Sequence, residues 1–165
     1  MRGSVDVGKF LITQKIDVDA QTLNFQDTAL HLAVQEGHEE IVKDLLNAHA
    51  NPNLKNCEIK IIRIMVFLSF IFETPIFIAV RWSRPEMVPL LVKNGGDINS
   101  TNAILFLNYF IIFHFNFFHK ETPLSVAIQF NSSTMTKALI AEKASTNIPS
   151  IDIKSIEKLK NQSEA

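Results

Sequence analysis

The sequence has very little cysteine: Cys57 is the only one among 165 residues. No disulfide can form within the chain, so a covalently stapled secreted domain is excluded. The expected setting is a reducing compartment, either the cytoplasm or the nucleus. The first residues do not resemble a secretion signal, because Asp6 and Lys9 interrupt any apolar region.

An excess of one charge is also missing. Lysine and arginine together number 16, against 17 acidic residues. A chain with a net charge of only −1 has no general electrostatic attraction for nucleic acid or for an anionic membrane surface. We therefore expect no nucleic-acid partner, and composition gives no reason to expect a membrane partner.

Motifs for catalysis are missing as well. The five histidines lie at no metal-ligand spacing from cysteine or acidic partners, and no G-x-S-x-G or G-x-G-x-x-G sequence occurs. The pair Gly95-Gly96 lacks the G-K-[ST] context of a phosphate loop, and Cys57 has no placed base. The sequence thus predicts a protein that is not an enzyme, with no catalytic residues, no cofactor and no metal site.

What the sequence does contain is a repeated segment. Residues 27–53 read DTALHLAVQEGHEEIVKDLLNAHANPN, and similar segments begin at Thr74 and at Thr122. Half a copy precedes them in residues 3–19. Three and a half copies in register indicate a repeat architecture.

Each copy has the pattern of two short helices separated by a turn. Thr28 is placed to cap the first helix with its hydroxyl, and Pro75 and Pro123 of the later copies suit the first helical position. Gly95 is expected to end the second helix of the second copy in a left-handed conformation. In the first copy, two apolar stripes at helical spacing flank Gly37: Leu30, Ala33 and Val34 before it, and Ile41, Val42, Leu45 and Leu46 after it. One such unit cannot bury its own apolar face, so neighbouring units must stack.

These copies resemble the ankyrin repeat, whose signature opens with a Thr-Pro-Leu-His run like that at Thr28. The resemblance implies an all-α fold, an ankyrin-type helix-turn-helix solenoid with short β-turn or hairpin connections. It also implies a structural role for His31, which would tie neighbouring loops together by hydrogen bonds. The implied domain is 1–150, with a half repeat at 3–26, repeats at about 27–56, 73–102 and 121–150, insertions at 57–72 and 103–120, and a polar tail at 151–165.

The resemblance implies a function too. Arrays of this family bind other proteins, without catalysis, on a concave face built from turn tips and first helices. The positions that vary within this family can be transferred to each copy in turn. They predict a partner-binding surface at Gln35, Glu36, Arg81, Trp82, Gln129 and Phe130. Tryptophan and arginine side by side are typical energetic anchors of interfaces. The alternative is that Trp82 and Phe130 only cover the turns between their helices.

The copies are spaced more widely than the family requires. Successive capping threonines lie 46 and 48 positions apart, whereas ankyrin units recur about every 33 residues. The surplus falls both times in the turn before the next threonine, in residues 57–72 and 103–120. These insertions hold nine of the 13 phenylalanines and no glycine, proline or aspartate, the residues that turns favour.

Four interpretations of the insertions stay open. They could be exposed hydrophobic fingers. They could also form a packed hairpin or a packed helix pair, although no amphipathic period marks a hairpin or a helix pair. Residues 103–118 suggest a membrane segment, but this run is shorter than the usual 18 residues or so and contains Asn108, His114 and Asn116. Finally, the composition resembles translated A/T-rich introns, which would make the insertions errors of a gene model.

A further departure is Pro89, in the second helix of the second copy. If that helix began at Pro85, Pro89 would remove its first hydrogen bond and cost up to about 3 kcal/mol. A later start would cost less.

Two functional hypotheses follow. The first is a non-enzymatic scaffold or adaptor that binds a protein partner on the concave face. The second is a regulatory or targeting segment of a larger protein, such as a kinase, channel or ubiquitin ligase, because Met1 falls just before the inter-helix glycine of the half copy. A membrane-associated ankyrin protein is a variant of the second, if residues 103–118 insert.

Overall fold

Three helical pairs and a small sheet make up the part of the chain that the structure describes. This computed structural model describes residues 16–62, 67–108 and 121–146, so most of the predicted half repeat and the whole predicted tail lie outside it. The helices are α2 (Ala29–Glu36), α3 (Glu39–Asn47), α4 (Pro75–Arg81), α5 (Met87–Lys93), α6 (Pro123–Gln129) and α7 (Ser133–Ala141). The strands are β1 (Glu58–Ile62), β2 (Phe67–Phe72) and β3 (Ala103–Asn108).

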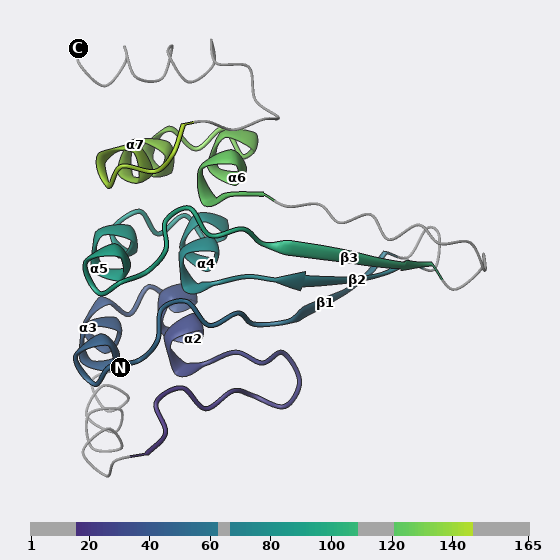
Figure 1. Cartoon of the computed structure of the whole chain (residues 1–165), viewed down its shortest axis with the longest axis horizontal. Coiled ribbons are helices and arrows are strands. Elements are labelled where there is room, and N and C mark those ends of the chain that lie inside the picture. The colour runs from purple at the N-terminus through teal and green to yellow at the C-terminus, as the bar shows by residue number, and fades with distance from the viewer. Residues whose placement is uncertain (1–15, 63–66, 109–120, 147–165) are drawn as a thin grey trace.

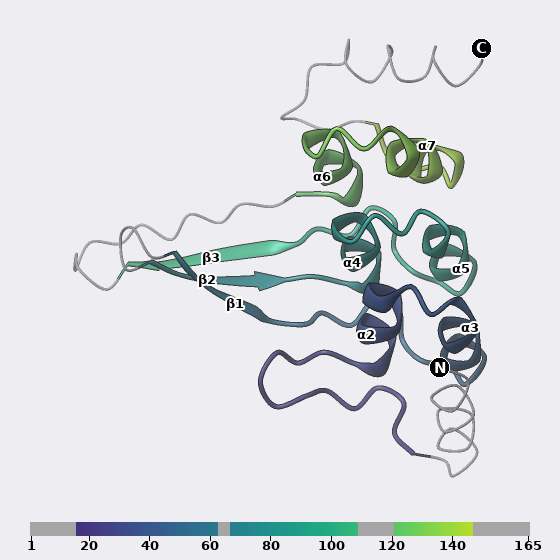
Figure 2. The ribbon, with the colours of Figure 1, turned by 180° about the vertical axis from the view of Figure 1, so that it is seen from behind.

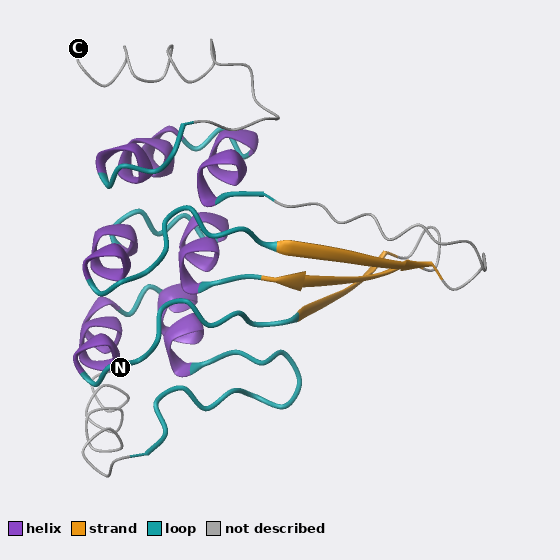
Figure 3. Cartoon of the chain, viewed as in Figure 1, coloured by secondary structure: helices purple, strands orange, loops and turns teal. Residues whose placement is uncertain are grey.

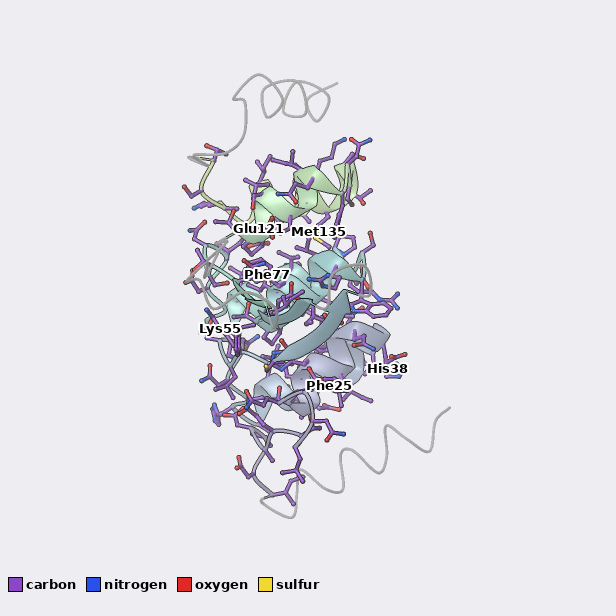
Figure 4. The ribbon with its side chains drawn as sticks, turned by 90° about the vertical axis from the view of Figure 1, so that its right-hand side faces the viewer. Phe25, His38, Lys55, Phe77, Glu121 and Met135 are labelled. Carbon is purple, nitrogen blue, oxygen red and sulfur yellow. The ribbon has the colours of Figure 1, made fainter. Side chains whose placement is uncertain are left out.

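The helical pairs stack in two columns, as Figures 1 and 2 show from opposite sides. In one column α4 packs between α2 and α6, and in the other α5 packs between α3 and α7. Large buried side chains fill the space between layers, among them Leu30, Phe77, Met87 and Met135, of which Phe77 and Met135 are labelled in Figure 4. The predicted all-α solenoid is confirmed.

The first helix of each pair begins directly after its threonine, as predicted. Thr28 Oγ1 accepts from the backbone N–H of His31, and the N–H of Thr28 donates to His31 Nδ1. Thr122 and Ser125 make the same reciprocal pair of bonds at the start of α6. Pro75 and Pro123 are the first residues of α4 and α6, where a missing N–H costs nothing.

The second helix of the second pair starts late enough to accept its proline. α5 begins at Met87, so Pro89 is its third residue. The first four amides of a helix have no intrahelical acceptor, and Pro89 therefore removes no hydrogen bond. The larger cost considered for a helix starting at Pro85 does not arise.

Left-handed backbone conformations recur in register through the three pairs. They lie in the turn between the helices and just after the second helix, in the order Gly37, His49, Ser83, Gly95, Asn131 and Lys143. The conformation predicted for Gly95 is confirmed, with a φ of 88°. Side chains occupy four of these six positions, although the left-handed region disfavours residues with a Cβ.

A ladder of hydrogen bonds joins the turns that follow the second helices. In each step a side-chain oxygen of one turn accepts a backbone N–H of the next turn. The acceptor and donor residues are Asp19 and Asn51 (2.8 Å), Asn53 and Asp97 (2.7 Å), and Asn99 and Ser145 (2.7 Å). The turns on this side of the stack thus keep a constant spacing along the array.

The described strands of the two insertions project sideways from the stack and are shown in orange in Figure 3; we call the insertions fingers. β1 and β2 form an antiparallel hairpin in the first insertion, and β3, from the second, pairs antiparallel with β2. The hairpin interpretation lacked a sequence signal because runs such as FLSFIF have apolar residues at consecutive positions, which hides the strand period of two. Among the described residues no helix is both long and apolar enough to cross a membrane, and most of 103–118 lies outside them.

Replacing Gly95 by alanine should cost about 1 kcal/mol of unfolding free energy. Nothing lies within 4 Å of the added Cβ, so no steric clash adds to the left-handed strain. At Gly37 the new Cβ would also meet the guanidinium of Arg84 at 2.9 Å, and Gly37→Ala should cost more unless Arg84 moves. Urea unfolding followed by circular dichroism measures both, and Ser83→Gly is the opposite control, with an expected gain. An unchanged midpoint for Gly95→Ala would contradict the strain argument.

Candidate functional site

Each finger begins and ends at the same kind of hydrogen-bonded pair. In the first finger, the N–H of Asn56 donates to the Glu73 carbonyl at 2.9 Å, and the N–H of Glu73 donates to Asn56 Oδ1 at 3.1 Å. Asn102 and Glu121 make the same two bonds in the second finger, at 3.0 and 2.8 Å. We call each of these pairs a clamp. A clamp closes the base of each finger, and the first helices on either side of it pack against each other.

The carboxylate of Glu73 is buried and paired with an arginine. Its side chain is 2% exposed, and Arg81 binds it with two groups: Nε donates to Oε2 at 3.0 Å and Nη2 donates to Oε1. Burial opposes the charge on Arg81, but the hydrogen bonds to Glu73 outweigh it and raise the pKa of Arg81. Such a two-pronged pair fixes the end of α4 against the base of the finger.

The same arrangement recurs one repeat later with an amide in place of the arginine. Gln129, at the end of α6, donates from Nε2 to Glu121 Oε1 at 2.9 Å. Glu121 also accepts from Asn102 Nδ2 at 3.2 Å. An acid before the threonine and a donor eight positions later therefore form a repeated contact between finger base and first helix.

His31 joins the first clamp from the neighbouring repeat. Its Nδ1 accepts the N–H of Thr28 at 3.2 Å, so Nε2 carries the proton and donates to the Glu73 carbonyl at 3.1 Å. Burial lowers the pKa of His31 from its ordinary 6.5, and the bond to the Glu73 carbonyl opposes this only in part. The ring is held neutral, in the bridging role that the resemblance implied.

A groove of about 410 Å³ lies between the first helices and the base of the first finger. Its apolar lining comes from Phe25, Leu32, Ile78 and Trp82. Three of these are substantially exposed: Phe25 at 46%, Leu32 at 43% and Trp82 at 50%. The polar lining comes from Asp27, Gln35, Asn56, Glu58 and Arg81. An open groove with exposed apolar side chains and charged groups around them suits a protein ligand.

Three of the six predicted partner-binding residues line this groove: Gln35, Arg81 and Trp82. Glu36 lies beside Gln35 and accepts from its Nε2 at 3.2 Å. Gln129 and Phe130 occupy the corresponding places at the end of α6, outside the groove, and Phe130 is 53% exposed. The guanidinium of Arg81 is engaged by Glu73, so its first role is structural. Partner binding by the six residues stays a prediction.

The sequence interpretation did not single out Phe25, Asp27, Leu32 or Asn56 as site residues. A signal for some of them existed. Asp27 precedes the first threonine as Glu73 and Glu121 precede the later ones, and Asn56 and Asn102 both stand just before an insertion. No comparable signal marks Phe25, whose exposure depends on the path of its loop.

The described residues hold no cluster of three or more His, Cys, Asp or Glu side chains that could bind a metal ion. Burial raises the pKa of the Cys57 thiol. The thiolate, which is the nucleophilic form, is therefore disfavoured there.

Stacked helical pairs, hairpins that project to one side and an open groove define a helical repeat protein of the kind that serves protein interaction. The Ankyrin repeat family model matches residues 25–57 and 73–103. The chain carries ankyrin repeats, and the ankyrin fold is a protein-interaction fold. The third helical pair, α6 and α7, repeats the same geometry outside the matched ranges.

A similar curated protein is Inversin of Canis lupus familiaris. The two are 26% identical over 150 residues, which cover 90% of this chain and 11% of Inversin. The chain thus spans about a tenth of the length of that relative.

Replacing Arg81 by methionine should destabilise the fold by about 2–3 kcal/mol, because it leaves the buried Glu73 carboxylate without its cation. Arg81 is itself partly exposed, so the loss should fall below that of a fully buried pair. The double variant Arg81→Met/Glu73→Gln removes the stranded charge and should recover much of the loss. Urea unfolding of both variants measures this. If the single and the double variant are equally stable, the stranded charge on Glu73 has no effect, and Arg81 stabilises the fold only through packing.

The free energy of unfolding should also decrease as the pH is lowered below about 6.5, because of His31. The unfolded chain takes up a proton on this ring near its ordinary pKa, whereas the folded chain, with its lowered pKa, does not. The stabilisation is thus complete above pH 6.5 and declines by up to about 1.4 kcal/mol per pH unit below it, until the folded pKa is reached. Urea unfolding at several pH values measures the slope.

The matched control is His31→Ser, because Ser125 caps α6 at the same position. This variant should be less stable at neutral pH and should have a shallower slope between pH 6.5 and 5. The two proteins differ only at this residue, so the difference in slope reports His31. Identical slopes would contradict a neutral buried ring.

Proposed function

We propose that this chain is a non-enzymatic scaffold or adaptor module that binds a protein partner along the exposed ends of its first helices. The observation that supports this most is the exposure of two large aromatic side chains in register. Trp82 and Phe130 follow directly after α4 and α6 and are 50% and 53% exposed. Large exposed aromatic residues are typical anchors of protein interfaces.

The interior of the stack favours the same proposal. Phe77, at the position of His31 in the next repeat, is 1% exposed, so the fold can bury a large aromatic side chain in these helices. Trp82 and Phe130 instead lie on the surface, where their apolar area is in contact with water. Burying that area against a partner is favourable at about 25 cal/mol per Å².

A second candidate function is that of a regulatory or targeting segment within a larger polypeptide. It is favoured by the comparison with Inversin, of which the matched region is only 11%. Both candidates use the same surface and need no catalytic group. In either case we expect the protein to work in the cytoplasm or nucleus.

Partner capture tests the surface. The tagged protein and its Trp82→Ala/Phe130→Ala variant are used to capture proteins from a cell lysate, which quantitative mass spectrometry then compares. Truncating a central aromatic anchor costs about 2 kcal/mol or more, so true partners should be depleted at least about tenfold. Circular dichroism checks that the variant keeps its helices.

Leu23→Ala is the matched control, since Leu23 is fully exposed on the loop before α2 and does not line the groove. Partners should bind this variant like the parent. Arg81 is left unchanged, because its loss would disturb the fold through Glu73. If the double variant retains every protein that the parent captures, the aromatic surface is not the binding site.

A further inference from the structure

The turn that ends α5 contains the one asparagine of the sequence that precedes a glycine. Asn94 is followed by Gly95, and both residues are exposed. The backbone nitrogen of the next residue attacks an asparagine side chain most readily when that residue is glycine, because no side chain hinders the approach. The attack forms a five-membered succinimide, which water then opens to a carboxylate. Asn94 is thus a candidate for deamidation.

In the folded protein, hydrogen bonds hold both of the groups that would react. Asn94 Nδ2 donates to the Leu90 carbonyl at 2.9 Å. The N–H of Gly95 donates to the Val92 carbonyl at 3.0 Å. From the turn after α3, Asn53 Nδ2 donates to the Gly95 carbonyl at 2.8 Å. The amide that would be lost and the nitrogen that would attack it are therefore both bonded.

The backbone of Asn94 also has the wrong conformation for ring closure. The succinimide ring is nearly flat, so the Gly95 nitrogen must come close to eclipsing Cβ of Asn94. The ψ angle of Asn94 is 23°, which instead brings that nitrogen close to eclipsing the backbone nitrogen of Asn94 itself. The end of the helix must therefore open before the reaction can start. Exposed hydrogen bonds at a helix end open at little cost in free energy, so the fold slows the reaction but does not prevent it.

The turn after Asn94 has no room for a longer main chain. A Cβ added at Gly96 would meet the Leu91 carbonyl oxygen at 2.9 Å, so Gly96 packs directly against the end of α5. On the other side, the amide of Asn53 binds the Gly95 carbonyl through Nδ2 and accepts the N–H of Asp97 at 2.7 Å through Oδ1. A longer main chain just before Gly95 must therefore displace this turn from α5 or from Asn53.

We propose that Asn94 is a site of spontaneous deamidation, and that its isoaspartate product disconnects the ladder between the first and second repeats. The hydrogen bonds at the end of α5 and from Asn53 set the rate of this modification. The proposal does not depend on partner binding through Trp82 and Phe130, so either can fail without the other.

The only reactant besides the protein is water. The Gly95 nitrogen loses its proton to hydroxide and attacks Asn94 Cγ. The bond from Cγ to Nδ2 then breaks, and the departing nitrogen takes up a proton from water and leaves as ammonia. Hydrolysis of the succinimide at Cγ gives aspartate, whereas hydrolysis at the backbone carbonyl gives isoaspartate, whose main chain is one methylene longer. One water is consumed overall, and nothing is oxidised or reduced.

Deamidation of the unaltered protein is the first test. The folded protein, the protein in urea and a synthetic peptide of residues 90–99 in the same urea are incubated in mildly alkaline buffer, and peptide mapping by mass spectrometry follows Asn94. The unfolded protein and the peptide should react at the same rate. The folded protein should react at least about tenfold more slowly, because its reacting groups are bonded. Equal rates in the folded and unfolded protein, or no reaction in either, would overturn the proposal.

Asn53→Ala tests the contribution of the first repeat. This variant removes both side-chain bonds to the turn and should speed deamidation of the folded protein about threefold to tenfold. Asn99→Ala is the matched control, because it removes the corresponding bond of the next ladder step, to Ser145, and should leave the rate unchanged. An unchanged rate in Asn53→Ala, or an equal increase in both variants, would contradict the role of Asn53.

The isoaspartate product tests the effect on the ladder. Ion exchange isolates the deamidated protein, and Asn94→Asp supplies a protein of the same charge with a main chain of normal length. Amide hydrogen exchange followed by NMR should show faster exchange at Asp97 in the isoaspartate form than in Asn94→Asp. The N–H of Asn51, which is bonded to Asp19 in another ladder step, is the internal reference and should not change. Equal exchange at Asp97 in the two proteins would overturn the proposal.

Discussion

The hydrogen bonds of Glu73 hold the first two repeats together. Its N–H and its carbonyl both bond to Asn56, the carbonyl also accepts from His31 of the preceding repeat, and the carboxylate binds Arg81 at the end of α4. One residue thus joins the start of α2, the base of a finger and the end of α4. Asn56 and Arg81, which this residue binds, both line the groove, so the position of Glu73 helps to set the shape of the groove.

A second joint, where the second and third repeats meet, uses the same positions with different side chains. Phe77 takes the position of His31 and is buried, so an apolar contact replaces the histidine bridge. Glu121 meets Gln129 instead of an arginine. Among the described residues, the joint between the first two repeats therefore contains a buried carboxylate and a titratable ring, whereas the carboxylate of the second joint, Glu121, is only half-buried. Acid should loosen the first joint before the second.

Local signals in the sequence predicted the helices well. A threonine, a proline and a glycine act on neighbouring backbone groups, and their effects at Thr28, Pro75 and Gly95 can be foreseen from the sequence. The pair of Glu73 and Arg81 could not be foreseen in this way. Eight positions separate them, which is beyond the reach of side chains on one helix, and they meet only because the chain turns at Thr74.

The fingers show a different limit. Their strands are apolar at consecutive positions, so the period that identifies a strand is missing, and pairing of β2 with β3 depends on two insertions in different repeats. The exposure of Phe25 and Leu32 likewise depends on the path of a loop. The sequence could thus locate the candidate site through Trp82 and the predicted residues near it. The other residues that line the groove could be identified only from the three-dimensional structure.

Because the clamps close the bases of the fingers, the length of a finger can change without disturbing the solenoid. The two insertions contain 16 and 18 residues between clamp residues, both even numbers. In an antiparallel hairpin with a fixed base, adding residues in twos keeps every bonded pair in phase, whereas a single extra residue requires a bulge or a different turn. A protein built in this way can lengthen its reach in steps of one residue pair, about 3.4 Å each, while the solenoid below stays the same.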